Sequence, residues 1–169
     1  MNAIAYRPGS ARDRASLAEL LRSLSPQSSY ARFQAALGPD VPCRVLDALL
    51  PDGVRGGSVL AWDAGRLVGH GVWVRVGSGR VAEIALVVTD THQDRGIGTD
   101  LAERLLVAAA ARGMDRVEVF SAGGNRAVAR MVSRRAPAAE KVRDGAAVGY
   151  SFGLEESSRA GDPGRPRAA

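Results

Sequence analysis

The apolar residues in the first third of the chain recur mostly at helical spacing. Residues 3–6 form a short run typical of a β-strand, and Arg7-Pro8-Gly9 ends it. Two further helices are predicted over residues 30–37 and 41–50, because Gly and Pro residues follow each stretch. Before them, leucines three or four residues apart predict an amphipathic helix that Ser25-Pro26 ends: Leu17, Leu20, Leu21 and Leu24.

The middle of the chain is typical of three consecutive strands, which are expected over residues 58–62, 67–76 and 81–88. Turns that contain glycine separate these stretches, so the strands should form an antiparallel meander. The third stretch is apolar throughout except for Glu83. A strand of this kind is expected to be buried in a sheet.

The period of the apolar residues changes to that of a helix after residue 95. An amphipathic helix is predicted over residues 96–112, and then a strand over 117–120, a basic helix over 125–135 and a last strand over 146–152. Hairpins are thus followed by strand–helix–strand units. This order predicts a mixed α/β fold with a central, mostly antiparallel mixed sheet flanked by helices.

Length and composition describe one ordinary globular domain. The chain has 169 residues, of which 46% are hydrophobic and 24% charged, and this suits a single core. We expect the domain to span residues 1–154. Residues 155–169 are rich in Glu, Ser, Arg, Gly and Pro, and we expect a disordered tail there.

The sequence also indicates in which cellular compartment the protein is expected. No apolar run approaches the ~20 residues of a membrane span, and the first residues do not resemble a signal peptide. The single cysteine, Cys43, excludes an internal disulfide framework, and free cysteines are usually buried. We therefore expect a cytoplasmic protein without membrane association, in which the Cys43 thiol is buried.

The formal net charge is +5, and one segment carries much of it. A solvated helix face and a surface for phosphate groups both fit such a segment. No helix-turn-helix, zinc-finger or RNP-like pattern is present, so no nucleic-acid partner is expected. His70 and His92 stand apart from residues at metal-ligand spacing, so no metal is expected. Residues 125–143 hold six basic residues against Glu140 alone: Arg126, Arg130, Arg134, Arg135, Lys141 and Arg143.

A polar loop with two glycines joins the strand at 81–88 directly to the next helix. A helix N-terminus offers unpaired N–H groups and a positive dipole end, and glycines let a ligand approach the backbone, so the loop is suited to phosphate. A Walker loop requires a lysine, which is missing before Thr99. A dinucleotide fingerprint requires a third glycine where Leu101 stands. Glu118 lies at about the sequence distance at which that fingerprint has its acidic residue. It falls in the middle of a predicted strand, however, so we do not assign it that role.

The run Gln93-Asp94-Arg95-Gly96-Ile97-Gly98 matches the Gln/Arg-x-x-Gly-x-Gly/Ala motif of GNAT acetyltransferases, and the order of elements over residues 3–154 resembles that superfamily. The resemblance implies acetyl-CoA as cosubstrate, with its pyrophosphate on the backbone amides of residues 93–99. It also implies that the backbone of Leu86 and Val88 pairs with the pantetheine arm, as an added strand would. Asn125 matches the asparagine that opens the last helix of many members. The cofactor-binding residues that the resemblance implies are Leu86, Val87, Val88, Gln93, Asp94, Arg95, Gly96, Ile97, Gly98, Thr99 and Asn125.

Glu83 is the candidate general base. A lysine amine has a pKa of ~10.4 and must lose a proton before it can attack. A carboxylate in a partly apolar cleft can take that proton directly or through water. The alternative is an edge carboxylate that faces solvent or pairs with an arginine. Many GNAT members use a tyrosine on the last helix as general acid, but Val132 stands there, so the acid is unassigned.

The segment Leu24-Ser25-Pro26-Gln27-Ser28-Ser29-Tyr30-Ala31-Arg32-Phe33 resembles the Leu-Ser-Pro-Glu-Ser-x-Tyr-x-Arg-Phe stretch of Pat-type protein lysine acetyltransferases. Their strand also carries its catalytic glutamate where Glu83 falls. Gln27 for Glu, and Ala136-Pro137 for Gly-Phe, depart from the pattern. The resemblance implies that the acceptor partner is an amine, here a protein lysine. A monomer or a homodimer is expected, and the sequence does not choose between them.

Two alternatives remain open from the sequence. The acceptor could be a small-molecule amine such as an aminoglycoside, a polyamine or an amino acid. The chain could also be a module that senses acyl-CoA without catalysis. Turnover on an amine separates this last alternative from the other two.

Overall fold

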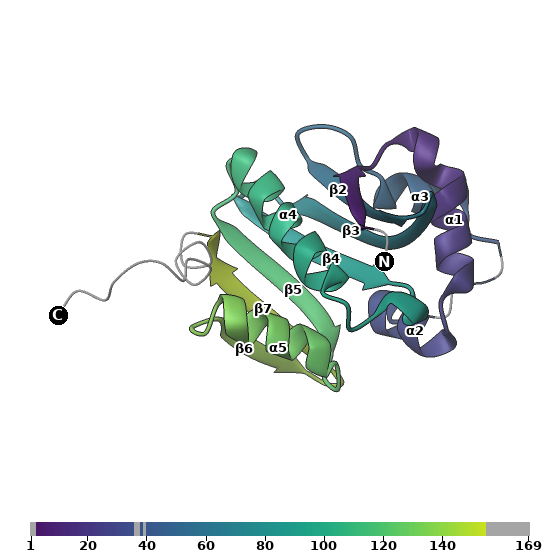
Figure 1. Ribbon diagram of the computed structural model, residues 1–169. Helices are drawn as coiled ribbons and strands as arrows, with labels where there is room; N and C mark the ends of the chain where they lie inside the picture. The colour runs from purple at the N-terminus through teal and green to yellow at the C-terminus, as the bar shows by residue number, and fades with distance from the viewer. Residues whose placement is uncertain (1–2, 36–37, 39, 155–169) are drawn as a thin grey trace.

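The computed structural model describes residues 3–35, 38 and 40–154. Within them one seven-stranded sheet has the order β1-β2-β3-β4-β5-β7-β6 (Figure 1). Neighbouring strands are antiparallel except β4 and β5, which are parallel. The strands are β1 (Ala5–Pro8), β2 (Gly56–Asp63), β3 (Arg66–Val76), β4 (Val81–Val88), β5 (Arg116–Ala122), β6 (Glu140–Asp144) and β7 (Ala147–Gly153). The helices are η1 (Ala11–Asp13), α1 (Arg14–Ser23), α2 (Pro26–Phe33), α3 (Cys43–Leu49), η2 (Asp90–His92), α4 (Ile97–Ala111) and α5 (Arg126–Arg135).

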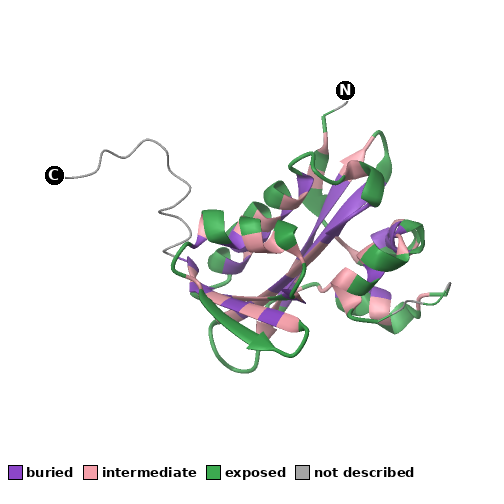
Figure 2. Ribbon diagram, turned by 90° about the horizontal axis from the view of Figure 1, so that it is seen from below, coloured by how far each residue is buried: buried purple, intermediate pink, exposed green. Residues whose placement is uncertain are grey.

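Two apolar cores lie on opposite faces of this sheet, with buried strands between layers of helices (Figure 2). Because successive side chains of a strand point to opposite faces, β4 contributes Ile84 to one core and Val87 to the other. The first core contains α4 residues such as Leu101, and the second contains α1 residues such as Leu17. Each buried leucine stabilises the fold by roughly 1.5–3 kcal/mol. The sheet is thereby fixed from both sides.

Two glycines in β3 bring α4 close to the sheet. A Cβ atom at Gly71 would lie 2.6 Å from the Leu105 Cδ1 atom, and one at Gly69 would lie 3.0 Å from the Leu101 Cδ1 atom. Side chains at these two positions would therefore push the helix away from the strand. The close approach holds the beginning of α4 against the sheet, next to the end of β4.

An ion pair joins β1 to the first helical turn. Arg7 Nη1 donates to Asp13 Oδ2 at 3.0 Å, and the Ser10 backbone N–H donates to the same oxygen at 2.9 Å. The hydrogen bond from Arg7, with support from Ser10, lowers the pKa of Asp13 to about 2, against the opposing effect of burial. Asp13 is buried, so solvent screens this interaction less than it would on an open surface.

We expect Asp13→Asn to lower the free energy of unfolding by about 2 kcal/mol at neutral pH. The folded-state pKa lies below the unfolded value, so the carboxylate stabilises the protein above about pH 4 and this contribution is lost as pH falls towards about 2. Urea unfolding of both proteins at several pH values measures the effect. A stability difference that stays constant down to about pH 2 would contradict the ion-pair explanation.

The structure differs from the sequence prediction at three places. The helix expected over residues 30–37 is α2, which begins earlier because Ser25 caps it: the Ser25 side chain accepts a hydrogen bond from the Ser28 N–H at 3.2 Å. Strand β6 was not predicted, because all of its residues are exposed and leave no alternation to detect. The expectation of a buried Cys43 is wrong, since its side chain is exposed at the start of α3.

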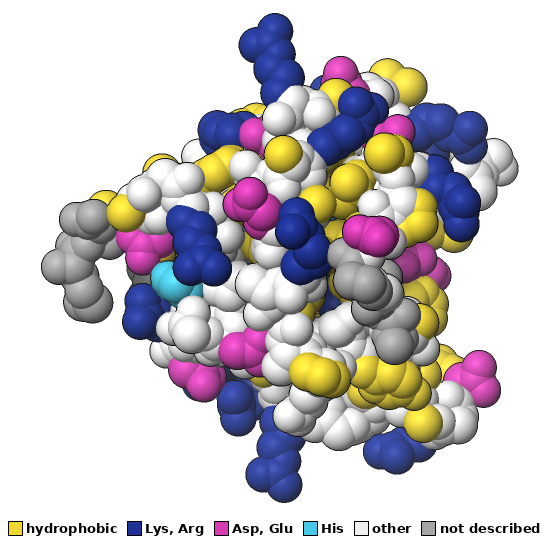
Figure 3. Space-filling model, turned by 90° about the vertical axis from the view of Figure 1, so that its right-hand side faces the viewer, with side chains coloured by type: hydrophobic (Ala, Val, Ile, Leu, Met, Phe, Trp, Pro, Cys, Tyr) yellow, Lys and Arg dark blue, Asp and Glu magenta, His cyan; other side chains and the backbone are white. Residues whose placement is uncertain are grey.

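Three further observations concern membrane helices, surface charge and the C-terminal tail. No helix in the part of the chain that the structure describes has the length and apolarity needed to cross a membrane. On the face that carries α1, α2 and α3, basic and acidic side chains are interspersed (Figure 3). The tail predicted over residues 155–169 lies outside the described residues.

Candidate active site

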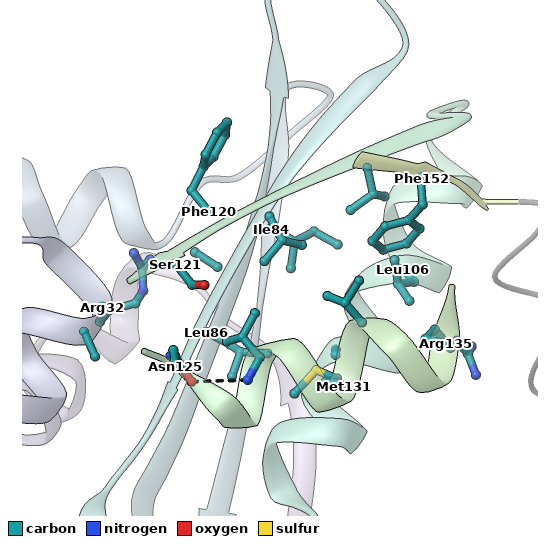
Figure 4. A pocket seen from close by; sticks show the side chains of 17 residues that line it. Arg32, Ile84, Leu86, Leu106, Phe120, Ser121, Asn125, Met131, Arg135 and Phe152 are labelled. Carbon is teal, nitrogen blue, oxygen red and sulfur yellow. Dashed lines mark hydrogen bonds between the residues drawn. The ribbon is translucent and has the colours of Figure 1, made fainter. Parts of the chain in front are cut away.

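Strands β4 and β5 separate after a short parallel ladder. The described pairing joins residues 81–83 to residues 116–118. Beyond it a cavity lies between the two strands and helices α4 and α5 (Figure 4). Its walls are mainly apolar, with Leu86 from β4, Val119 from β5 and Met131 from α5. The separation leaves one edge of β4 free over its second half.

The free edge of β4 presents backbone groups to this gap. The Thr89 N–H donates to the Val68 carbonyl oxygen at 2.9 Å, and the antiparallel register continues from there along β3. Because hydrogen-bonded pairs alternate in such a ladder, the N–H and C=O groups of Leu86 and Val88 point away from β3. Those of Val87 point towards β3, and its side chain belongs to a core. The backbone groups of Leu86 and the N–H of Val88 can therefore pair with an extended ligand, whereas the Val88 carbonyl oxygen already accepts a hydrogen bond from Gln93.

The loop before α4 has a backbone shape suited to an anion. Asp94 and Gly96 have positive φ values of 58° and 83°, and Asp100 donates the first helical hydrogen bond, to Gly96 at 3.0 Å. The N–H groups of residues 97–99 precede that bond and are free to bind a ligand. The Ile97 side chain is buried, so this residue can offer only its backbone to a ligand. The loop fits a phosphate group at the positive end of the α4 dipole.

Gly98 leaves room between this loop and the cavity. A Cβ atom there would lie 3.7 Å from Leu86 Cδ1, 3.7 Å from Met131 Cε and 4.0 Å from Val88 Cγ2. These are ordinary contact distances, so the glycine is not required by packing. It faces the side chains that line the space between β4 and α5. A larger residue would fill part of the space in which we expect the cofactor.

Two further polar residues frame the site. Asn125 caps α5 by accepting a hydrogen bond from the Val128 N–H at 3.2 Å, and it lines the cavity. Gln93 Nε2 donates to the Val88 carbonyl oxygen at 3.1 Å and to Ser28 Oγ at 3.2 Å. Gln93 thus joins the end of β4, the glycine loop and α2.

Asp90 fixes α2 to the same loop. Its carboxylate accepts hydrogen bonds from Ser25 Oγ and Ser28 Oγ, both at 2.7 Å, and from the Ser25 N–H at 3.0 Å. Burial opposes ionisation of Asp90, but these hydrogen bonds outweigh it and lower its pKa below the ordinary value. The segment at residues 24–33 is therefore rigidly placed beside the site.

Glu83 stands in the last described pair before β4 and β5 separate, opposite Val74 on β3 and Glu118 on β5. It is half-buried. Arg32 extends from α2 to the rim of the cavity, near Ser121 in Figure 4. Burial lowers the pKa of Arg32 to about 10, and the negative charge of Glu83 opposes that shift. The Arg32 Nε atom is buried without a hydrogen-bond partner among the described residues.

His70 is a structural residue. It is 1% exposed, and its Nε2 atom lies 2.7 Å from the Leu49 carbonyl oxygen, to which it donates in the neutral form. Burial lowers its pKa to about 4, and the positive charge of Arg32 adds to this effect. Its imidazole is therefore neutral near pH 7 and links β3 to α3.

The basic segment is divided by the structure. Arg126, Arg130 and Arg134 occupy one exposed stripe of α5, four residues apart. Arg135 instead forms an ion pair with Glu103 on α4, with 3.2 Å between Arg135 Nη1 and Glu103 Oε1. The stripe fits both a solvated helix face and a surface for phosphate.

Sequence reasoning did not assign three residues at this site. Arg32 was noticed only as part of a motif, and Glu118 only as an unsuitable match to a dinucleotide fingerprint. Phe120 was part of a predicted strand, yet it is 57% exposed and lines the cavity. The parallel pairing of β4 with β5 brings Glu118 to Glu83, and the sequence contains no local signal for that pairing.

The family model of the acetyltransferase (GNAT) family matches residues 18–135. Among solved structures, the GNAT domain of S. lividans PAT is similar with a TM-score of 0.80 and 21% identity, over 90% of this chain and 91% of that one. YncA of Salmonella typhimurium, a putative acetyltransferase solved with its cofactor acetyl-CoA, has a TM-score of 0.66 and 16% identity, over 99% and 100%. A cAMP-binding acyltransferase of Mycobacterium smegmatis, in a mutant form, has a TM-score of 0.63 and 22% identity, over 95% of this chain and 47% of that one. No curated protein matched the chain.

The family match covers well over half of the chain, and the chain belongs to the GNAT acetyltransferase family. It is therefore an N-acetyltransferase that uses acetyl-CoA. The fold agrees with this assignment, since the mixed sheet parts at the site where the glycine loop begins α4.

Proposed function

We propose that this enzyme acetylates a lysine side chain of a protein, with Glu83 as general base. The observation that carries the proposal is the position of Glu83. It is the one charged residue of β4, and it stands in the last pair before that strand and β5 separate. An amine at this opening would lie between the carboxylate and the free edge of β4.

The chemistry requires a base because an ammonium group has no free electron pair. Acetyl-CoA supplies the acetyl group as a thioester, whose carbonyl carbon accepts the nitrogen. Glu83 accepts one proton of the ammonium group, directly or through water, so that the neutral amine can attack. The free N–H of Leu86 is a suitable donor to the carbonyl oxygen as negative charge develops there. Residues 97–99 hold the pyrophosphate through backbone amides.

The proposed cofactor contacts divide by what they offer. Leu86 and Val88 contribute backbone groups, and Asn125 lies at the cavity wall. The remaining contacts belong to the loop, where Asp94 and Gly96 supply its curvature. The backbone of Val87 is directed to β3, so any contact it makes is indirect. The loop contacts proposed are Gln93, Asp94, Arg95, Gly96, Ile97, Gly98 and Thr99.

Protein lysine is the acceptor favoured by the segment at residues 24–33. This segment resembles a stretch of Pat-type lysine acetyltransferases, and hydrogen bonds to Asp90 fix it beside the site. The fold is similar to that of the GNAT domain of S. lividans PAT. Incubation with acetyl-CoA and a lysine peptide library, followed by mass spectrometry, tests protein lysine as the acceptor. Transfer to polyamines or aminoglycosides with none to peptides would contradict the lysine proposal.

Acetyl-CoA is expected to raise the unfolding temperature by roughly 5–10 °C at one hundred times its dissociation constant. A ligand that binds the folded state alone adds about 2.7 kcal/mol under that condition, and 1 kcal/mol corresponds to roughly 2–4 °C for a chain of this size. Thermal shift with acetyl-CoA, free CoA and NAD measures the effect. A shift with NAD equal to that with acetyl-CoA would contradict the assigned loop function.

A further inference from the structure

Two carboxylates lie side by side where β4 and β5 separate. Glu83 and Glu118 are in register on parallel neighbouring strands, so their side chains project from the same face. Neighbouring strands are ~4.8 Å apart, and both residues are half-buried. Like charges in such a position destabilise a sheet. A bound cation would remove that cost.

The surrounding cations do not balance this pair. Arg75 on β3 is in register with Ala82, whose side chain lies on the opposite face. Arg116 on β5 donates to Ser151 Oγ and to Glu140 Oε2, both at 2.8 Å. Arg32 is the one charged residue of α2, which contacts both strands. One guanidinium thus faces two carboxylates, and the site has a net charge of −1.

Neither carboxylate is held by an ion pair within 4 Å among the described residues. Arg32 lies close enough for the charge of Glu83 to act on it, yet its buried Nε atom has no partner. This N–H group is a donor and could not bind an ammonium group, but its missing partner shows that Arg32 does not neutralise either carboxylate through a hydrogen bond from Nε. A ligand with one positive charge, bound by the two carboxylates, would make the site neutral.

An apolar surface adjoins the two carboxylates. Phe120 follows Glu118 by two residues and therefore lies on the same face of β5. Its ring covers Gly149 on β7, where a Cβ atom would lie 3.1 Å from Phe120 Cε1. The ring remains 57% exposed and offers a wall for methylene groups. An ammonium group at the end of an aliphatic stem fits the charge and the wall together.

We propose that Glu118 binds the acceptor: with Glu83 it holds the incoming ammonium group, while Phe120 contacts the aliphatic stem behind it. This inference rests on the proposed function, because Glu83 then accepts the proton that this ammonium group releases. Glu118 remains charged and stays in contact with the amine. Glu118 therefore selects a cationic acceptor, whereas proton transfer is the role of Glu83.

Glu118→Gln is expected to raise the KM for the acceptor by about tenfold or more, since a hydrogen bond between two charged groups is stronger than one to a neutral amide. The KM for acetyl-CoA should stay unchanged, and kcat should change by less than about threefold. Glu118→Asp keeps the charge and should recover part of the loss. Steady-state kinetics with a lysine peptide measure these constants, and Glu19→Gln, at an exposed position of α1, is the matched control.

The outcomes separate this inference from the function on which it rests. An unchanged acceptor KM in Glu118→Gln, with the acetyl-CoA thermal shift intact, overturns the role of Glu118 and leaves lysine acetylation standing. If the wild type acetylates a small amine and no peptide, a raised KM for that amine supports the ammonium site while the lysine proposal fails. Transfer by the wild type to no amine overturns both.

Discussion

Replacing Glu83 with glutamine is expected to slow acetyl transfer by roughly 100-fold or more, while the affinity for acetyl-CoA stays unchanged. General-base catalysis contributes about 10²–10⁴-fold, and glutamine keeps the size of the side chain but cannot accept a proton. Glu83 does not line the cavity that is proposed for the cofactor. The loss should therefore appear in kcat. Transfer to a lysine peptide, followed over a range of pH, measures it.

Two comparisons make this result specific. Glu118→Gln changes a carboxylate one strand away and should act on the acceptor KM, so the two variants should differ in which kinetic constant they change. Thermal shift with acetyl-CoA shows whether the Glu83 variant is folded and binds its donor. Wild-type turnover in Glu83→Gln at every pH would remove Glu83 from the mechanism.

The positive charge of Arg32 affects the charge balance around Glu83. Its guanidinium keeps a pKa of about 10 despite burial, so it is charged at neutral pH. The site must therefore keep a carboxylate nearby to balance that charge. Glu118 allows Glu83 to take up a proton without leaving Arg32 as the sole charge in a half-buried place. In the proposed mechanism, Glu118 would provide charge balance and Glu83 would accept the proton.

Much of the fold follows from patterns that are local in the sequence. The buried strand β4 and the amphipathic helix α4 were predicted from apolar periodicity, because each buries one regular set of side chains. Strand β6 was missed for the opposite reason. It is an exposed edge with one apolar residue, Val142, and it is held by backbone pairing with β7. Such pairing depends on the partner strand rather than on the sequence of the edge.

The site divides in the same way. The glycine loop could be proposed as a binding site because loop and helix are contiguous in the sequence, and Glu83 as a base because a charge in an apolar strand is unusual. Arg32 and Glu118 lie far from Glu83 along the chain. They meet it through the docking of α2 and the parallel ladder between β4 and β5. Sequence periodicity assigns a residue to a face, whereas the order of the strands decides which faces become neighbours.

Gly98→Asp should reduce the affinity for acetyl-CoA by at least about 100-fold without unfolding the protein, because it brings bulk and negative charge to a site for pyrophosphate. Packing does not oppose the substitution, since a Cβ atom at this position has no neighbour closer than 3.7 Å. An aspartate in the first turn of α4 also interacts favourably with the helix dipole. Stability and affinity should therefore change independently, which calorimetric titration and thermal unfolding measure together. Gly79→Asp, in an open turn whose nearest neighbour lies at 3.8 Å, is the matched control. Wild-type affinity in Gly98→Asp would show that the pyrophosphate binds elsewhere, because a carboxylate at this position would repel a pyrophosphate bound to the same loop.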